Sequence, residues 1–185
     1  MAAKSNTRNM ILSLAAVCLV CSGILGVVYS LTAEPIAQSA KKQLQQALSQ
    51  VLPEGSQVDP EAVVLQKDGV SYECYKAETP EGSGAWAVKS SSNGFGGAVT
   101  VLVGVKDGAV CSTCVLSHSE TPGLGAKCAE QQSLFVTQFE GKTFSDLVLK
   151  KDGGQLDAIT GSTITSRAYT LAVANAVALI AENYE

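Results

Sequence analysis

An uncharged, mostly apolar run of about 22 residues extends from Met10 to Leu31. Such a run is long enough to cross a hydrocarbon core of roughly 30 Å, and an uncleaved anchor is favoured over a removed signal peptide, whose apolar part is shorter. We therefore expect residues 1–31 to form a short cytoplasmic N-terminus and a single transmembrane anchor in contact with lipid. Lys4 and Arg8 precede the run, which predicts a cytoplasmic (inner) membrane protein whose C-terminal part lies on the extracytoplasmic side.

A helical pattern continues beyond this run, and we expect residues 32–53 to form a juxtamembrane stalk with one packed face. Pro35 fits a first helical turn better than a helix interior, so a kink or a restart is expected there. Pro53 is expected to end the segment. The apolar residues at helical spacing are Ile36, Ala40, Leu44, Ala47, Leu48 and Val51.

Residues 54–185 read as one α+β domain with an antiparallel sheet and helices, because apparent strands are followed by apparent helices rather than alternating with them. Two Lys-Asp-Gly triplets, at 67–69 and 106–108, are typical of hairpin turns. The glycine-rich stretch 93–97 lacks the Walker pattern, which favours a tight turn over a phosphate cradle. The strands are expected at 62–66, 70–76, 85–91, 98–105 and 109–117, and the helices at 128–139 and 167–184.

Composition excludes several classes of function. A net charge of −4 and an aromatic content of 5% argue against nucleic-acid binding. No Ser-His-Asp set or carboxylate pair indicates hydrolysis, and no catalytic side chain is assigned. The cysteines after the anchor form no dense disulfide pattern, so free thiols used as small core residues are favoured over disulfides. They also match no ferredoxin spacing, so no metal site is expected. These cysteines are Cys74, Cys111, Cys114 and Cys128.

The segment Asp157-Ala-Ile-Thr-Gly-Ser-Thr-Ile-Thr-Ser166 directly precedes the last apparent helix, expected to begin near Ser166. Free N–H groups and the helix dipole make a helix start suitable for an anion such as phosphate. Taken alone, the hydroxyls have a simpler explanation as helix caps. A helix cap needs only one hydroxyl, however, and several hydroxyls lie close to Gly161. Capping alone therefore does not explain their number. These hydroxyl residues are Thr160, Ser162, Thr163, Thr165 and Ser166.

This segment closely resembles the flavinylation motif of the covalent FMN-binding domain family. The family includes the G subunit of the Rnf ferredoxin:NAD oxidoreductase and the C subunit of the sodium-pumping NADH:quinone reductase. The resemblance implies that a flavin transferase links FMN through its phosphate to Thr163. It also implies that the neighbouring residues bind the cofactor, namely Thr160, Gly161, Ser162, Thr165 and Ser166. Ser162 stands where the family usually has alanine, so a second hydroxyl neighbours the expected acceptor. The role of Asp157 stays open between a Mg²⁺ used in attachment, recognition by the transferase and a turn cap.

A second stretch, His118-Ser-Glu-Thr-Pro-Gly-Leu-Gly125, is similar to a loop of the Rnf G subunit that lies against the flavin; on its own it would pass for a surface turn. Phe95-Gly96-Gly97 and Val99–Val105 also resemble that subunit. The resemblance implies that Glu120, Thr121, Leu124 and Gly125 contact the cofactor. Leu124 would supply apolar contact and Thr121 a hydrogen bond, whereas Glu120 would tune the flavin or only brace the loop.

The resemblance implies an electron-relay role alongside the other subunits of an Rnf membrane complex. That complex would couple ferredoxin:NAD electron transfer to Na⁺ or H⁺ translocation, and this chain alone would complete no reaction. The C subunit of the quinone reductase is the nearest alternative. A membrane-anchored assembly module without flavin is an alternative of a different class.

Overall fold

The computed structural model describes residues 7–67, 69–80 and 82–184 and divides into two compact units, Met1–Gln43 and Leu44–Glu185. The described part of the first unit belongs to helix α1 (Thr7–Val51). This helix continues through Pro35 without interruption, so the expected restart at that residue is wrong. Proline removes one backbone hydrogen bond of the helix, and the neighbouring turns hold the helix together.

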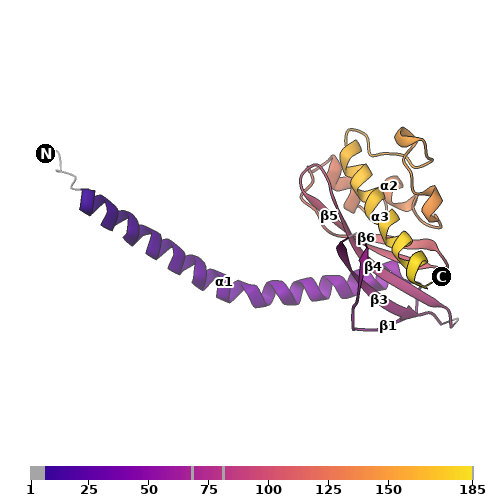
Figure 1. The fold of residues 1–185 in the computed structure, drawn as a ribbon, viewed down its shortest axis with the longest axis horizontal. Helices are drawn as coiled ribbons and strands as arrows, with labels where there is room; N and C mark the ends of the chain where they lie inside the picture. The colour runs from indigo at the N-terminus through magenta and orange to yellow at the C-terminus, as the bar shows by residue number, and fades with distance from the viewer. Residues whose placement is uncertain (1–6, 68, 81, 185) are drawn as a thin grey trace. The chain divides into compact units, whose positions relative to one another are not determined.

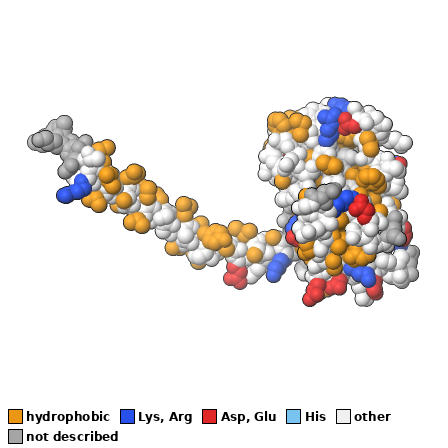
Figure 2. Space-filling model, viewed as in Figure 1, with side chains coloured by type: hydrophobic (Ala, Val, Ile, Leu, Met, Phe, Trp, Pro, Cys, Tyr) orange, Lys and Arg blue, Asp and Glu red, His pale blue; other side chains and the backbone are white. Residues whose placement is uncertain are grey.

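Helix α1 is long and apolar enough to cross a membrane, and none of its most apolar window is buried inside the protein. Figure 2 shows hydrophobic side chains along its exposed length, with charged side chains near the two ends of that length. Helix α3 (Thr163–Tyr184) is also long and apolar enough to cross a membrane, but 61% of its most apolar window is buried inside the protein. Helix α3 is therefore explained as the core helix of the second unit.

The second unit contains an antiparallel sheet in the order β1-β3-β4-β5-β6, with β2 also pairing with β3. The predicted strands are confirmed to within a few residues at each end, whereas β1 was not predicted because it is only two residues long. The strands are β1 (Gln57–Val58), β2 (Val63–Lys67), β3 (Val70–Glu78), β4 (Gly84–Asn93), β5 (Ala98–Lys106) and β6 (Ala109–Ser117).

The connections β4–β5 and β5–β6 are short turns, as their sequences predict. At the β5–β6 turn, Asp107 has φ 52° and Gly108 has φ 70°, the pair of positive values that a tight hairpin requires. The glycine-rich stretch 93–97 forms the β4–β5 turn, in which the Gly94 N–H donates to the Gly97 carbonyl at 2.8 Å. This confirms the tight turn predicted there.

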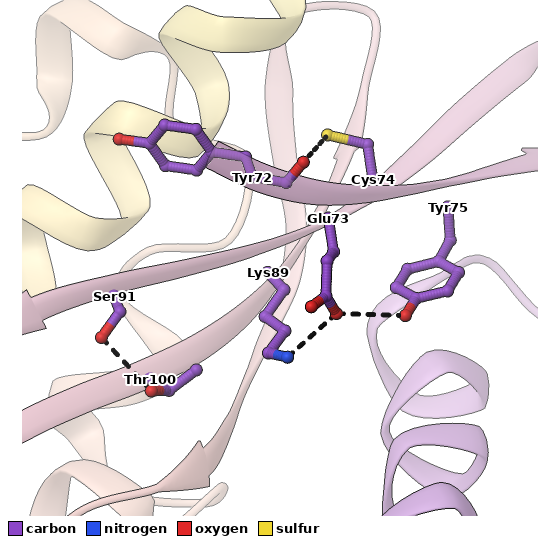
Figure 3. Close-up of polar contacts among 7 residues, drawn as sticks. All are labelled: Tyr72, Glu73, Cys74, Tyr75, Lys89, Ser91 and Thr100. Carbon is purple, nitrogen blue, oxygen red and sulfur yellow. Dashed lines mark hydrogen bonds and ion pairs between the residues drawn. The ribbon is translucent and has the colours of Figure 1, made fainter. Parts of the chain in front are cut away.

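Both faces of the central strands are buried, because helices lie on the two sides of the sheet (Figure 1). Helix α3 packs on one face of β4 and β5, and the last turns of α1, including Leu48 and Val51, pack on the other. Figure 3 shows the alternation along β3: Tyr72 points to one side, whereas Glu73 and Tyr75 point to the other, with the Glu73 carboxylate accepting from Lys89 Nζ at 2.9 Å.

The segment between β6 and α3 is mostly irregular and corrects one prediction. The helix expected at 128–139 is instead a 3₁₀ turn, η1 (Gly125–Ala129), and a short helix, α2 (Leu134–Thr137). Two further 3₁₀ turns follow, η2 (Phe144–Asp146) and η3 (Lys150–Asp152). Phe135 and Phe139 from this segment pack their rings against Tyr169 of α3, which anchors the segment on the core.

Candidate functional site

Helix α3 begins at Thr163, three residues before the start expected near Ser166. Gly161 turns the chain into the helix with φ 78°, a conformation that glycine adopts without strain. The first helical hydrogen bond runs from the Ser166 N–H to the Ser162 carbonyl at 3.0 Å. The N–H groups of residues 163–165 precede that bond and therefore have no acceptor within the helix.

Ser166 has a structural role at this helix start. Its fully buried hydroxyl accepts from the Ile159 N–H and donates to the Ser162 carbonyl, both at 2.9 Å. Thr160 is exposed. Neither Ser166 nor Thr160 lines the pocket beside the helix, so the structure does not bring these two predicted site residues into it.

A pocket of about 400 Å³ lies beside the first turn of α3, within the size range of small-molecule sites. Eight of the ten predicted site residues line it, from two segments distant in sequence. Apolar side chains on the rim are well exposed, at 71% for Phe95, 47% for Leu124 and 52% for Ile164. The lining residues are Phe95, Glu120, Thr121, Leu124, Gly125, Gly161, Ser162, Thr163, Ile164 and Thr165.

Glu120 holds the walls of this pocket together. Its side chain is 5% exposed, and its two carboxylate oxygens accept from different segments. Oε1 accepts from the Gly96 N–H of the β4–β5 turn at 3.1 Å, and Oε2 accepts from the Thr165 hydroxyl of α3 at 2.7 Å. A side chain at Gly125 would place its Cβ 2.6 Å from Oε2, so the close packing requires glycine there.

The loop that carries Glu120 is ordered by its own hydrogen bonds. The only histidine, His118, accepts from the Glu120 N–H through Nδ1 at 3.2 Å. The Thr121 carbonyl accepts from the N–H groups of Leu124 and Ala126, both at 3.2 Å. These bonds present the Leu124 side chain to the pocket.

Sequence reasoning missed three residues at this site. Phe95 and Ile164 line the pocket, and Lys151 Nζ donates to the Thr163 hydroxyl at 2.9 Å. Phe95 lies in a stretch that resembles the Rnf G subunit, which was the available signal. Nothing in the sequence around Lys151 marks it, because lysine is common in polar turns.

The remaining candidate groups lie outside the pocket. The Asp157 carboxylate pairs with Lys150 Nζ at 2.7 Å, and its backbone N–H and carbonyl bond to the Gln138 side chain. Burial raises the pKa of the Cys74 and Cys128 thiols to about 11, so both thiols are protonated at neutral pH. All six cysteines are free, and the described residues contain no group of three or more metal-ligating side chains.

Two protein-family models match the chain. The model of the FMN-binding domain matches residues 94–178, and the model of the RnfG N-terminal region matches residues 1–51. The first match includes every residue that lines the pocket. A curated relative, the G subunit of the ion-translocating oxidoreductase complex of Vibrio cholerae (strain M66-2), is 36% identical over 94% of this chain and 90% of its own length.

The chain belongs to the family of G subunits of ion-translocating oxidoreductase complexes. Other members of the family are similar to a comparable degree. The G subunit of Shewanella baltica (strain OS223) is 34% identical over 89% of this chain and 84% of its own length. The G subunit of Aliivibrio fischeri (strain ATCC 700601 / ES114) is 36% identical over 90% of this chain and 86% of its own length.

A solved structure supports the fold assigned to this family member. The C subunit of the Na⁺-translocating NADH-quinone reductase from Parabacteroides distasonis matches with a TM-score of 0.53, over 68% of this chain and 77% of that chain. At 18% identity, the likeness establishes a shared fold alone. The G-subunit relatives and the RnfG N-terminal match therefore favour the G family over the quinone-reductase alternative.

Proposed function

We propose that this chain carries FMN, attached through its phosphate to Thr163, and relays electrons within an ion-translocating membrane complex. The observation that carries the proposal is the position of the Thr163 hydroxyl, which lines the pocket at the first residue of α3 within the segment matched by the FMN-binding family. An anion attached there would lie at the positive end of the helix dipole, a favourable interaction of about 0.3–1 kcal/mol.

The residues present fit such a group. The first-turn N–H groups and Lys151 suit a phosphate, and the apolar side chains of Phe95, Leu124 and Ile164 suit a flat aromatic ring system. When bound, FMN supplies the electron-transfer chemistry. The chain's own residues fix its position, and no side chain is required as a general acid or base.

Thr163 is favoured over Ser162 as the attachment residue because its side chain is more accessible. Ser162 is 8% exposed, whereas Thr163 is partly exposed. An enzyme that forms a phosphoester must reach the acceptor oxygen, so the buried serine is the poorer acceptor. This comparison supports the linkage predicted from the motif.

In the complex, we place residues 1–31 as the cytoplasmic N-terminus and anchor, 32–53 as the stalk and 54–185 as the extracytoplasmic FMN-binding domain. The partners would be the other subunits, lipid and a flavin transferase, and the coupled reaction would be ferredoxin:NAD electron transfer with Na⁺ or H⁺ translocation. A covalent link suits a carrier on that side of the membrane, because lost FMN could not readily be replaced from the cytoplasm.

Co-production with a flavin transferase tests the proposal. The enzyme would transfer the FMN phosphoryl group from a flavin dinucleotide to the Thr163 oxygen. In that step the phosphoanhydride bond breaks, a nucleoside monophosphate leaves and the hydroxyl proton passes to solvent. The chain should fluoresce on a denaturing gel under ultraviolet light, and its intact mass should increase by FMN minus water. Thr163→Val should abolish both signals without changing the melting temperature, whereas Ser162→Ala should retain both. A dark wild-type band would favour the flavin-free assembly module, and fluorescence lost only in Ser162→Ala would move the linkage to that residue.

A further inference from the structure

Lys151 contacts the proposed attachment oxygen from a separate segment of the chain. It lies in the 3₁₀ turn η3, twelve residues before Thr163, and its ammonium donates to the Thr163 hydroxyl at 2.9 Å. A hydroxyl gains little from a flexible surface lysine, because holding the long side chain in place costs conformational entropy. A phosphate on the same oxygen would gain much more from this cation.

The turn that carries Lys151 is fixed on the domain. The turn is flanked by two buried leucines, Leu149 and Leu156, at 2% and 1% exposure, and the Lys150 N–H donates to the Leu156 carbonyl at 2.8 Å. Arg167, one helical turn after Thr163, donates to both oxygens of Asp152 at 2.9 and 2.6 Å. The turn is therefore tied to the first turns of α3, and Lys151 is held where its ammonium reaches Thr163.

The neighbouring charges are already paired. Lys150 contacts the Asp157 carboxylate at 2.7 Å, and Asp152 contacts Arg167. Within the part of the chain that the structure describes, the hydrogen-bond partner of the Lys151 ammonium is a hydroxyl rather than a carboxylate. The hydrogen bonds and the charge of Arg167 lower the pKa of the Asp152 carboxyl, and the Lys151 charge lowers it further. The hydrogen bonds to that carboxylate come from Arg167, so the Lys151 ammonium can still donate to an anion at Thr163.

We propose that Lys151 is the cationic partner of the phosphate at Thr163 and positions the attached cofactor against the pocket. The proposal rests on the proposed attachment of FMN to Thr163. Lysine binds phosphate as a point charge rather than through a bidentate fork, so the interaction depends on the presence of the ammonium at this position. Lys151 is a positioning residue and takes no part in electron transfer.

The test compares Lys151→Met with Lys150→Met, a matched control in the same turn with the same change of charge and size. The full chain is co-produced with limiting flavin transferase, and the loaded fraction is followed by intact mass. Lys151→Met should load about tenfold more slowly, the effect expected for loss of one charge-assisted hydrogen bond. Lys150→Met should load at the wild-type rate, and Lys151→Arg should restore most of the lost rate.

The ³¹P resonance of the loaded protein decides whether the lysine acts on the phosphate itself. It should move in Lys151→Met and stay unchanged in Lys150→Met. If Lys151→Met does not load, Lys151→Arg supplies loaded protein. The arginine donates from a different position than the lysine, so this variant should also move the ³¹P resonance. An unchanged resonance in the Lys151 variant overturns the proposal, even with slow loading, because the lysine would then act on the transferase. Equal shifts of the ³¹P resonance in Lys151→Met and Lys150→Met overturn it too.

These outcomes separate the two proposals. Wild-type protein that remains unloaded, or Thr163→Val protein that loads, removes the attachment at Thr163 and with it the role of Lys151. Normal loading of the wild type together with a wild-type resonance in Lys151→Met removes only the role of the lysine.

Discussion

Glu120 is a buried carboxylate with two hydrogen-bond donors from different segments, Gly96 and Thr165. The resemblance left open whether this residue tunes a flavin or braces the loop. Its contacts support the bracing role, because both oxygens are engaged by the protein. Buried polar groups cost stability when they lose their partners, which makes the role measurable.

Glu120→Ala should lower the free energy of unfolding by about 2 kcal/mol, because the Thr165 hydroxyl and the Gly96 N–H lose their acceptor. Urea unfolding followed by the fluorescence of Trp86, the only tryptophan, measures the change. Glu120→Gln, which keeps one oxygen, should lose less. An unchanged unfolding midpoint in Glu120→Ala would contradict the bracing role.

Among the elements, the turn η3 and the first turns of α3 are joined by the Asp152–Arg167 ion pair. The hydrogen bonds from Arg167 lower the pKa of the Asp152 carboxyl below its ordinary value. A carboxyl with a lowered pKa in the folded state contributes stability that is complete above its unfolded pKa of about 3.9. That contribution is lost as the pH falls through the lower, folded value.

Asp152→Asn should therefore destabilise the protein at neutral pH and have less effect in acid. The difference in free energy of unfolding between wild type and variant should be constant above about pH 5 and shrink below about pH 4. Urea unfolding across this range measures it. A difference that grows in acid would contradict the assignment of the lowered pKa to this ion pair.

The C-terminal end of α1 packs against β5 at Gly104. A Cβ on this glycine would collide with the Val51 carbonyl, so the helix end lies against the strand backbone. Gly104→Ala should lower the free energy of unfolding by about 1–3 kcal/mol, the usual cost of overpacking. Gly84→Ala is the control, because a Cβ there meets nothing within 4 Å. Equal unfolding midpoints for the two variants would contradict this packing.

Local sequence predicted the strands well and the helix boundaries less well. The strand-like segments and the Lys-Asp-Gly turns beside them are local signals, so β2 to β6 were found. The start of α3 was placed too late because a run of hydroxyl residues suits both a cap and a first helical turn. The helix expected at 128–139 fails since packing against Tyr169 overrides its local preference.

For the molecule as a whole, the site could be predicted only in part. Eight of the pocket residues were predicted from the two motifs, because each motif lies within one short segment. Lys151 reaches Thr163 only through tertiary packing of η3 against α3, and no local pattern reports such a contact. The candidate membrane anchor was predicted from the sequence alone, because a long apolar run is a local signal.

The side of the membrane that the domain faces is also a property of the whole molecule. Alkaline phosphatase fused to the C-terminus should be active, and green fluorescent protein fused there should be dark, because the charges before the span favour a cytoplasmic N-terminus. Replacing Lys4 and Arg8 with glutamate should weaken both differences. A fluorescent, phosphatase-negative pair of wild-type fusions would place the domain in the cytoplasm.

The pocket walls come from the β4–β5 turn, the loop around Glu120 and the start of α3. In a newly made, unfolded chain these stretches are far apart. Nothing in their arrangement then distinguishes the Thr163 hydroxyl from the other serine and threonine hydroxyls. An enzyme that recognises the assembled surface would reject such a chain and accept only a finished one. Cofactor loading would then follow maturation of the domain and serve as a checkpoint on it.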